Sequence, residues 1–165
     1  MTQGEVSVVV VAYNALPWIE QCLASVGGHE TVVVDHGSTD GTVAFVREKF
    51  PAVRLVEQEN RGLAAGWNRG IRETSGEHVL ILNADAWALG DAIERLADFA
   101  DAHPRTAVLG PRLRYPDGRL QPSVRGFPTH VRKPRFAEPT VGGYPRRMAV
   151  RGRRRGPRAW GALSS

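Results

Sequence analysis

The chain alternates between short runs of consecutive apolar residues and longer segments in which apolar residues recur every three or four positions. The first run, VSVVVVAY at 6–13, is almost entirely apolar, which is typical of a strand that helices cover on both faces. Pro17 opens the next segment, whose apolar positions from Ile19 to Val26 predict a helix with one buried face. The Gly-Gly pair that follows is expected to end this helix.

This unit of strand and helix repeats along the chain. A Pro-Asp-Gly turn within RLRYPDGRLQPS predicts a hairpin after the last repeat. The order of elements predicts an α/β sandwich with a doubly wound, mostly parallel sheet, in which ligands bind beyond the carboxyl ends of the strands. The further strands are predicted at 31–35, 53–57, 78–83 and 106–110, and the further helices at 40–49, at 62–73 and along Ile93, Leu96, Phe99 and Ala100.

The composition changes sharply at Pro128. Residues 1–128 carry 12 Lys and Arg against 16 Asp and Glu, a net charge of −4, whereas residues 129–165 carry 10 against 1, a net charge of +9. The second segment is rich in Arg, Gly and Pro and has no recurring apolar face. We therefore expect one domain at 1–128, followed by a basic, disordered tail at 129–165 that accounts for the overall charge of +5.

The single cysteine, Cys22, excludes an intramolecular disulfide and a Cys-rich metal cluster, and it suits a reducing cytoplasm. No basic and apolar leader opens the chain, and its longest apolar run is far shorter than the roughly 20 residues of a membrane helix. We therefore expect a cytoplasmic protein whose membrane contact, where it has one, is peripheral and on the inner face of the plasma membrane.

Four polar clusters follow predicted strands, at 13–14, 35–40, 60–70 and 83–85. A single cluster of this kind is more often a turn than a site. Because the carboxyl ends of parallel strands meet along one edge of the sheet, the four clusters together predict a single ligand pocket.

The cluster VVVDHGSTDGT ends a buried strand in Asp35. Its carboxylate can accept hydrogen bonds from a nucleotide base, and we favour this role over a structural one. Gly37 allows a tight turn that exposes backbone N–H groups. For Ser38 and Asp40, capping of the next helix is the favoured role.

Glycines recur at every fourth position of NRGLAAGWNRG, at Gly62, Gly66 and Gly70. They would share one face of a helix and permit a close approach either to the sheet or to a ligand. Asn60 and Asn68 can contact a nucleotide or bond to the local backbone. The spacing is neither a Walker loop nor a GxGxxG motif.

Asp85 follows the predicted strand that ends at Asn83. A carboxylate there can hold Mg²⁺ or Mn²⁺ against a diphosphate, because these ions prefer oxygen ligands and the phosphates supply several of them. The alternative is an ordinary helix cap, which an isolated Asn-x-Asp would favour.

The segments SVVVVAYN, VVVDHGSTDGT, ENRGLAAGWNRG and LILNAD, in this order, resemble the family 2 glycosyltransferases of GT-A fold, and rhamnosyltransferase-like enzymes most of all. The resemblance extends from Val6 to about Pro128 and implies a Rossmann-like domain that binds a nucleoside-diphosphate sugar. It departs from the family at His36, where Asn or Asp is commoner, and at Ala84, where Pro is common in the most similar enzymes.

The resemblance also implies roles for individual residues. Asp35 would face the base, the stretch 60–68 would flank the nucleotide and diphosphate, and Asp85 would bind the metal. The nucleotide-binding residues that the resemblance implies are Ala12, Tyr13, Asn14, Asp35, Gly37, Ser38, Asn60, Gly62, Gly66, Asn68, Asn83 and Ala84.

Enzymes of this family transfer a sugar from a donor, here expected to be dTDP- or UDP-linked, to a glycan or lipid-linked acceptor with inversion. The resemblance places the chain in cell-wall or surface polysaccharide synthesis. Family members continue into an acceptor-binding half that carries a catalytic carboxylate, and no residue of this chain matches it. We therefore assign no base, expect donor binding with little or no transfer, and interpret the change after Pro128 as a truncated or frame-shifted reading of a longer gene.

A rival hypothesis assigns the function to the basic tail, as a segment that binds nucleic acid or anionic lipid. The aromatic residues of the tail, Phe136, Tyr144 and Trp160, show no pattern suited to stacking on bases. Nucleic acid is therefore not expected as a partner.

Overall fold

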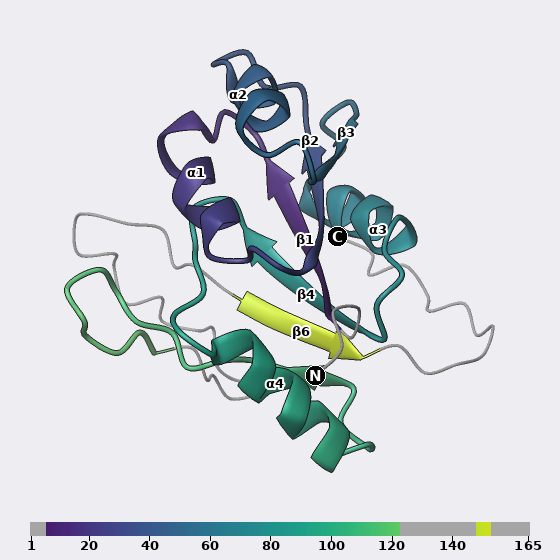
Figure 1. Cartoon of the computed structure of the whole chain (residues 1–165), viewed down its shortest axis with the longest axis vertical. Helices are drawn as coiled ribbons and strands as arrows, with labels where there is room; N and C mark the ends of the chain where they lie inside the picture. Colours follow the sequence, from purple (N-terminus) through teal and green to yellow (C-terminus); the bar gives the residue numbers. More distant parts are fainter. Residues whose placement is uncertain (1–5, 123–147, 153–165) are drawn as a thin grey trace, which may run out of the picture.

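A computed structural model describes residues 6–122 and 148–152 of the chain. The described part is a six-stranded sheet in the order β3-β2-β1-β4-β6-β5, with helices on both faces (Figure 1). The elements are β1 (Val6–Ala12), α1 (Leu16–Ala24), β2 (Glu30–Asp35), α2 (Thr42–Lys49), β3 (Arg54–Glu57), α3 (Leu63–Arg72), β4 (His78–Asn83), α4 (Ala92–Ala102), β5 (Val108–Leu109) and β6 (Met148–Gly152).

Strands β1 to β4 are parallel, with β1 in the centre between β2 and β4. Alternate side chains of β1 point to opposite faces of the sheet. Val8 and Val10 belong to the larger core, to which α1 and α4 contribute Ile19 and Ile93. Side chains of the other face, with Val11 among them, pack with Trp67 of α3. Both faces of the central strand are therefore buried, which confirms the doubly wound α/β fold that the continuous apolar run predicts.

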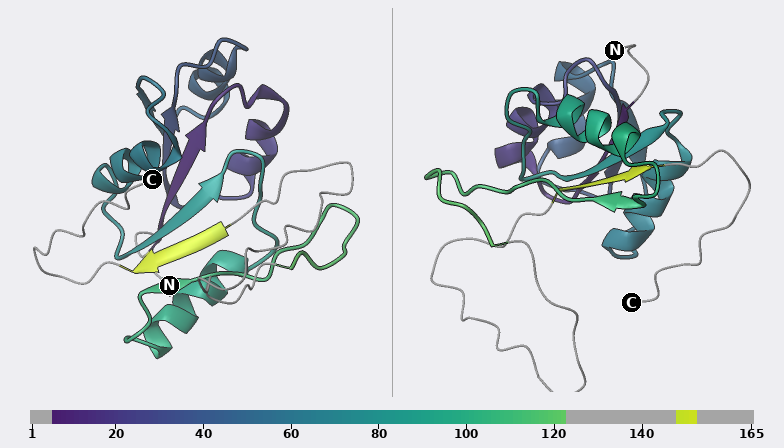
Figure 2. Two further views of the ribbon diagram at one scale, coloured as in Figure 1. Left: turned by 180° about the vertical axis from the view of Figure 1, so that it is seen from behind. Right: turned by 90° about the horizontal axis from the view of Figure 1, so that it is seen from below.

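Among the helices of the described residues, α3 covers one face of the sheet, and α1 and α4 lie on the other (Figure 2). Two glycines allow α3 to approach the strands closely. A Cβ atom at Gly70 would lie 2.3 Å from Cγ1 of Val9, and one at Gly66 would lie 2.6 Å from Nε2 of His36. Of the two interpretations that the glycine spacing allows, the close approach at these two positions is therefore to the sheet.

Strand β6 departs from the expectation of a tail without regular structure. Residues 148–152 pair antiparallel with β4 and with β5. A strand ladder is formed by backbone groups and needs no apolar periodicity, which is why the sequence pattern did not indicate this segment. The rest of the predicted tail lies outside the described residues, and the boundary at Pro128 stays a prediction.

The remaining elements follow the predicted order with small shifts. Helix α1 ends at Ala24, before the two glycines, and β5 has two residues instead of the five predicted. Phe99, which the pattern places on the apolar face of α4, is 48% exposed and stacks on His103. The prediction that Phe99 lies on this face is wrong, because the buried face of α4 contains Ile93 and Ala97.

The predicted hairpin is confirmed by an antiparallel bridge between Arg114 and Leu120. The amide of Gly118 donates to the carbonyl oxygen of Tyr115 and closes its turn. Across 6–122 and 148–152, the helices are all too short or too polar to cross a bilayer.

Candidate functional site

A pocket of about 280 Å³ lies at the carboxyl ends of β1 and β4, the neighbouring strands at the centre of the sheet (Figure 1). The start of α3 closes one side through Leu63. The loop after β1 and the start of α1 supply most of the other walls. The lining residues are Val11, Tyr13, Asn14, Ala15, Trp18, Leu63, Asn83, Ala84 and Asp85.

Helix α1 contacts the loop that carries Asp85 through the side chain of Cys22. The carbonyl oxygen of Asn83 accepts a hydrogen bond from the amide of Ala86 and a contact of 3.5 Å from Sγ of Cys22. Burial, assisted by the negative charge of Asp85, raises the pKa of Cys22 to about 12. Cys22 is therefore a protonated donor beneath the loop and not a metal ligand or nucleophile.

Asp85 does not serve as a helix cap. The next helix, α4, begins at Ala92 and has Asp91 at its N-cap position. The Asp85 side chain is half-buried and lines the pocket. Asp85 therefore does not cap α4, and its predicted role as a metal ligand stays a prediction.

Asn14 connects the loops that follow β1 and β2. It has a φ of +49°, the one positive φ of a non-glycine residue in the described part of the chain. Its amide donates to Oγ of Ser38 over 2.8 Å, and its Oδ1 accepts from the amide of Thr39 over 2.9 Å. These bonds fix the loop in which Tyr13, 58% exposed, stands beside the pocket.

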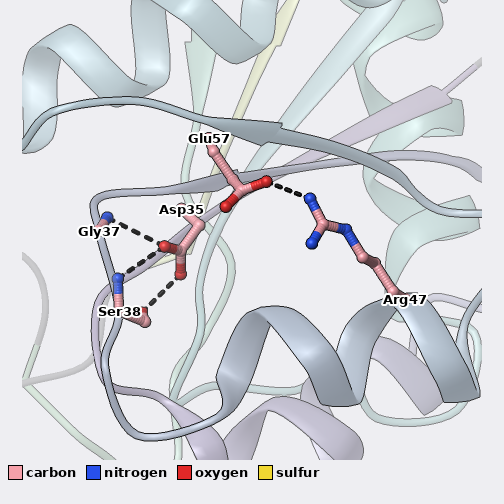
Figure 3. Close-up of polar contacts among 5 residues, drawn as sticks. All are labelled: Asp35, Gly37, Ser38, Arg47 and Glu57. Atoms are coloured by element: carbon pink, nitrogen blue, oxygen red, sulfur yellow. Dashed lines mark hydrogen bonds and ion pairs between the residues drawn. The ribbon is translucent and has the colours of Figure 1, made fainter.

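Asp35 is fully buried at the end of β2. Its Oδ1 accepts from the amides of Gly37 and Ser38 over 2.9 and 2.7 Å, and its Oδ2 accepts from Oγ of Ser38 over 2.5 Å. Figure 3 shows this carboxylate turned into its own loop, while the neighbouring Glu57 of β3 pairs with Arg47 of α2. In this structure Asp35 stabilises the turn, and its predicted contact with a base stays a prediction.

Asp40 connects the starts of two helices. Its Oδ1 accepts from the amide and hydroxyl of Thr42 over 3.0 and 2.6 Å, and its Oδ2 accepts from the amide of Leu16 over 3.0 Å. The hydroxyl of Thr42 in turn accepts from the amide of Ala15. Asp40 thus accepts from the first amide of both α1 and α2, although the N-cap residue of α2 is Gly41 and not Asp40. Ser38 bonds to Asp35 and Asn14 and does not cap α2.

Desolvation acts against ionisation of Asp40, but the hydrogen bonds from Thr42 and Leu16 outweigh it and hold the pKa of this carboxyl below its ordinary value. A carboxylate that accepts several hydrogen bonds is stabilised in its charged form. Asp40 is therefore an ionised acceptor that joins the first two strand-helix units.

The segment before and within α3 contributes less to the pocket than the sequence suggests. The Oδ1 of Asn60 accepts from the amide of Gly62, which has a φ of +85°. Asn68 is exposed on α3 and, like Asn60, is not among the pocket-lining residues. Gly66 faces His36, whose Nε2 lies 3.0 Å from Nε2 of Gln58. The imidazole ring of His36 fills the space that a side chain at position 66 would need, which is why this position suits glycine.

The pocket brings together part of the predicted set. Tyr13, Asn14, Asn83, Ala84 and Asp85 line it. The predicted residues that lie outside it are Ala12, Asp35, Gly37, Ser38, Asn60, Gly62, Gly66 and Asn68.

Sequence reasoning missed Trp18 and Leu63, both of which line the pocket. Trp18 is 45% exposed although its neighbour Ile19 is fully buried. An aromatic residue in the first turn of a helix, off the apolar face and directly after a strand, was the signal that could have identified it.

The protein groups that line the pocket suit a divalent ion only when a bound ligand supplies further oxygen atoms. Asp85 is the one carboxylate among the described residues that line the pocket, and 6–122 with 148–152 hold no group of three or more His, Cys, Asp or Glu placed to bind a metal. Mg²⁺ is commonly held by one or two carboxylates together with water and substrate phosphates. The site therefore fits a metal that arrives with a diphosphate.

Comparison with known sequences identifies relatives. A family model described as Glycosyl transferase family 2 matches residues 7–154. The chain is 35% identical over 143 residues to the N-acetylglucosaminyl-diphospho-decaprenol L-rhamnosyltransferase of Mycobacterium tuberculosis, a match that covers 76% of this chain and 46% of that protein. It is 32% identical over 104 residues to the glycosyltransferase GlyA of Streptococcus pneumoniae, covering 58% and 15%. The chain thus spans less than half the length of these relatives.

Solved structures show the same architecture. The mannosyltransferase PcManGT from Pyrobaculum calidifontis, in complex with GDP-Man and Mn²⁺, aligns with a TM-score of 0.62 at 33% identity and covers 71% of this chain and 37% of its own. TarS 1-349 of S. aureus in complex with UDP-GlcNAc aligns with a TM-score of 0.59 at 26% identity, covering 76% and 37%. The family match extends beyond Pro128, where the resemblance was expected to end, since it continues to residue 154.

Proposed function

Because this chain belongs to glycosyl transferase family 2, we propose that its pocket binds a nucleoside-diphosphate sugar together with Mg²⁺ or Mn²⁺. The observation that carries this proposal is the place of Asp85, half-buried in the pocket wall after the central strand β4 and not used as a helix cap. A structural neighbour that holds GDP-Man and Mn²⁺ supports the choice of ligand.

Each wall of the pocket suits a different part of this ligand. Asp85 would hold the metal ion, and the ion would stabilise the negative charge of the leaving diphosphate. Tyr13 and Trp18 present exposed aromatic surface on which a nucleoside can pack. Asn14 and Asn83 supply polar groups that can bond to ribose or phosphate, with a UDP or dTDP base as the first candidates.

We propose that the reaction is the transfer of the sugar, with inversion, to a glycan or lipid-linked acceptor in cell-wall or surface polysaccharide synthesis. A relative that acts on a diphospho-decaprenol sugar supports a lipid-linked acceptor. Inversion requires a base that deprotonates the attacking hydroxyl. Among the described residues that line the pocket, Asp85 is the one carboxylate that could act as this base, and it would be bound to the metal. We therefore propose that this chain binds the donor and transfers sugar weakly or not at all.

Donor binding is tested by calorimetric titration of the intact chain with UDP, dTDP and GDP, each with and without Mn²⁺. We expect measurable affinity only with Mn²⁺ and at least a roughly tenfold loss in Asp85→Asn, because a metal ligand is removed while the shape is kept. Asp91→Asn is the matched control, since Asp91 does not line the pocket. Equal binding by Asp85→Asn and the unchanged chain would contradict the proposal.

Transfer is tested separately with radiolabelled UDP-, dTDP- and GDP-sugars and a range of acceptors. Asp85→Ala serves as the background. We expect no turnover above that background. Robust metal-dependent transfer that Asp85→Ala abolishes would show that a base is present and would overturn the second part of the proposal.

A further inference from the structure

The segment 83–88, which runs from the end of β4 into the following loop, is attached to the end of α1 at two points. At its start, the carbonyl oxygen of Asn83 lies 3.5 Å from Sγ of Cys22. At its other end, the amide of Ala88 donates to Oγ of Ser25 over 3.0 Å. Cys22 and Ser25 are three positions apart, which places them on one side of the helix. The end of α1 therefore contacts both ends of the segment that carries Asp85.

The Ser25 hydroxyl is oriented by the helix that it follows. Ser25 is the C-cap residue of α1, with a φ of −75°, and its amide donates to the carbonyl oxygen of Gln21. Its hydroxyl donates to the carbonyl oxygen of Cys22 over 2.7 Å. A hydroxyl has one proton and two acceptor lone pairs. Because the proton is directed at Cys22, the oxygen presents a lone pair to the amide of Ala88.

Every second residue of the same segment packs against the core. Ala84 is 8% exposed and belongs to the core cluster that contains Ile19, and Ala86 and Ala88 pack against that cluster. Asp85 lies between two of these alanines and lines the pocket. An alanine methyl group buries little apolar surface, so packing by itself holds this backbone weakly. The contacts with the end of α1 add polar attachments to this packing.

We propose that Ser25 is a positioning residue for the metal, because its bond to the amide of Ala88 fixes the loop from which Asp85 would bind the ion. This inference rests on the proposed function, which assigns the metal to Asp85. Ser25 does not line the pocket, so its effect passes through the backbone of the loop. A ligand that is held in place before the ion arrives binds it more tightly, because less order has to be imposed on binding.

The first test measures amide hydrogen exchange in the intact Ser25→Ala chain, without metal or nucleotide. The amide of Ala88 loses its acceptor directly, so it is not informative. The amide of Ala86 is informative, because it donates to Asn83 and not to Ser25. We expect its exchange to be about tenfold faster, since a loosened loop opens more often. Unchanged exchange at Ala86 would show that Ser25 holds Ala88 alone and would overturn the inference.

The second test measures Mn²⁺ affinity by electron paramagnetic resonance of the free ion, in the presence of saturating UDP, dTDP or GDP. In Ser25→Ala we expect Mn²⁺ to bind about tenfold more weakly, as is common when a group behind a metal ligand is removed. Ser25→Thr keeps the hydroxyl and should bind Mn²⁺ like the unchanged chain. Thr74→Val is the matched control, because it removes a hydroxyl that donates to the carbonyl oxygen of Ile71 at the end of α3, outside the pocket.

These variants separate positioning from general destabilisation. Thr74→Val should lower the free energy of unfolding without changing Mn²⁺ affinity. Equal Mn²⁺ affinity in Ser25→Ala and the unchanged chain would overturn the inference, and so would an equal loss in Ser25→Ala and Thr74→Val. Nucleotide binding that fails in the unchanged chain would overturn the proposed function, whereas the exchange at Ala86 decides in either case whether Ser25 holds the loop.

Discussion

The loops after β2 and β4 occupy equivalent places, one on each side of the central strand β1, and both carry aspartates. Asp35 and Asp40 in the first loop accept hydrogen bonds from the protein's own amides and hydroxyls. Asp85 in the second loop lines the pocket. The same residue type at the same edge of the sheet thus lies in two different settings, a closed turn and a pocket wall.

The difference arises from the donors within reach. The loop after β2 turns back at Gly37, which presents two successive amides to Asp35. The loop after β4 turns through the carbonyl oxygen of Asn83 and leaves the Asp85 side chain at the pocket wall. The two turns therefore differ in the group that closes them, which is a side-chain carboxylate after β2 and a backbone carbonyl oxygen after β4.

Asp35→Ala should have the largest effect on stability. It removes a buried acceptor and leaves two amides and a hydroxyl without it, so we expect the free energy of unfolding to fall by about 3 kcal/mol. Urea unfolding followed by circular dichroism measures this loss. Ser38→Ala, which removes one of the three donors, should cost about 1 kcal/mol. A loss below about 1 kcal/mol in Asp35→Ala would indicate that this carboxylate is available to a base after all.

Asp40→Ala should destabilise the start of both α1 and α2. Loss of a side-chain acceptor for the first amides of a helix typically costs about 1–2 kcal/mol. Amide hydrogen exchange should therefore increase at Leu16 and at Thr42, whose amides bond to Asp40. Glu48→Ala is the control, because Glu48 lies in the last turn of α2 and bonds to neither amide. Faster exchange at Thr42 alone would contradict the joint role.

The contribution of Asp40 should depend on pH in one direction. Its pKa is lower in the folded chain than the ordinary 3.8, so its stabilising effect is complete above about that pH and is lost as the pH falls through the folded value. The stability difference between the unchanged chain and Asp40→Asn should therefore shrink as unfolding is measured from pH 6 down to pH 3. A difference that grows on acidification would mean that the carboxyl is stabilised in its protonated form.

Asp85→Asn should have the smallest effect on stability. Because this side chain caps no helix, the free energy of unfolding should change by no more than about 0.5 kcal/mol. The same urea titration used for Asp35→Ala measures it. A loss comparable with that of Asp35→Ala would show that both loops use their aspartates structurally and would remove the contrast between them.

Much of the fold could be predicted from local pattern. Continuous apolar runs predicted β1, β2 and β4, and the recurrence of Ile19 with Cys22 predicted the buried face of α1, because burial on both faces or on one leaves different periods in a sequence. Strand β6 could not be predicted in this way. It adds to the sheet through backbone pairing with β4, and its residues carry no pattern that marks the pairing.

The sequence by itself determined the order of strands and helices as far as β5, the burial of the central sheet and the family, since each depends on residue types at fixed spacing. Only the tertiary structure decided the roles of the polar residues. Asn14 bonds to the loop at 38–39, and Asp40 bonds to the start of α1, in both cases across more than twenty positions. A side chain's partners depend on which distant segments the fold brings beside it, and for Asp35 and Asp85 those neighbours decide between a turn and a pocket wall.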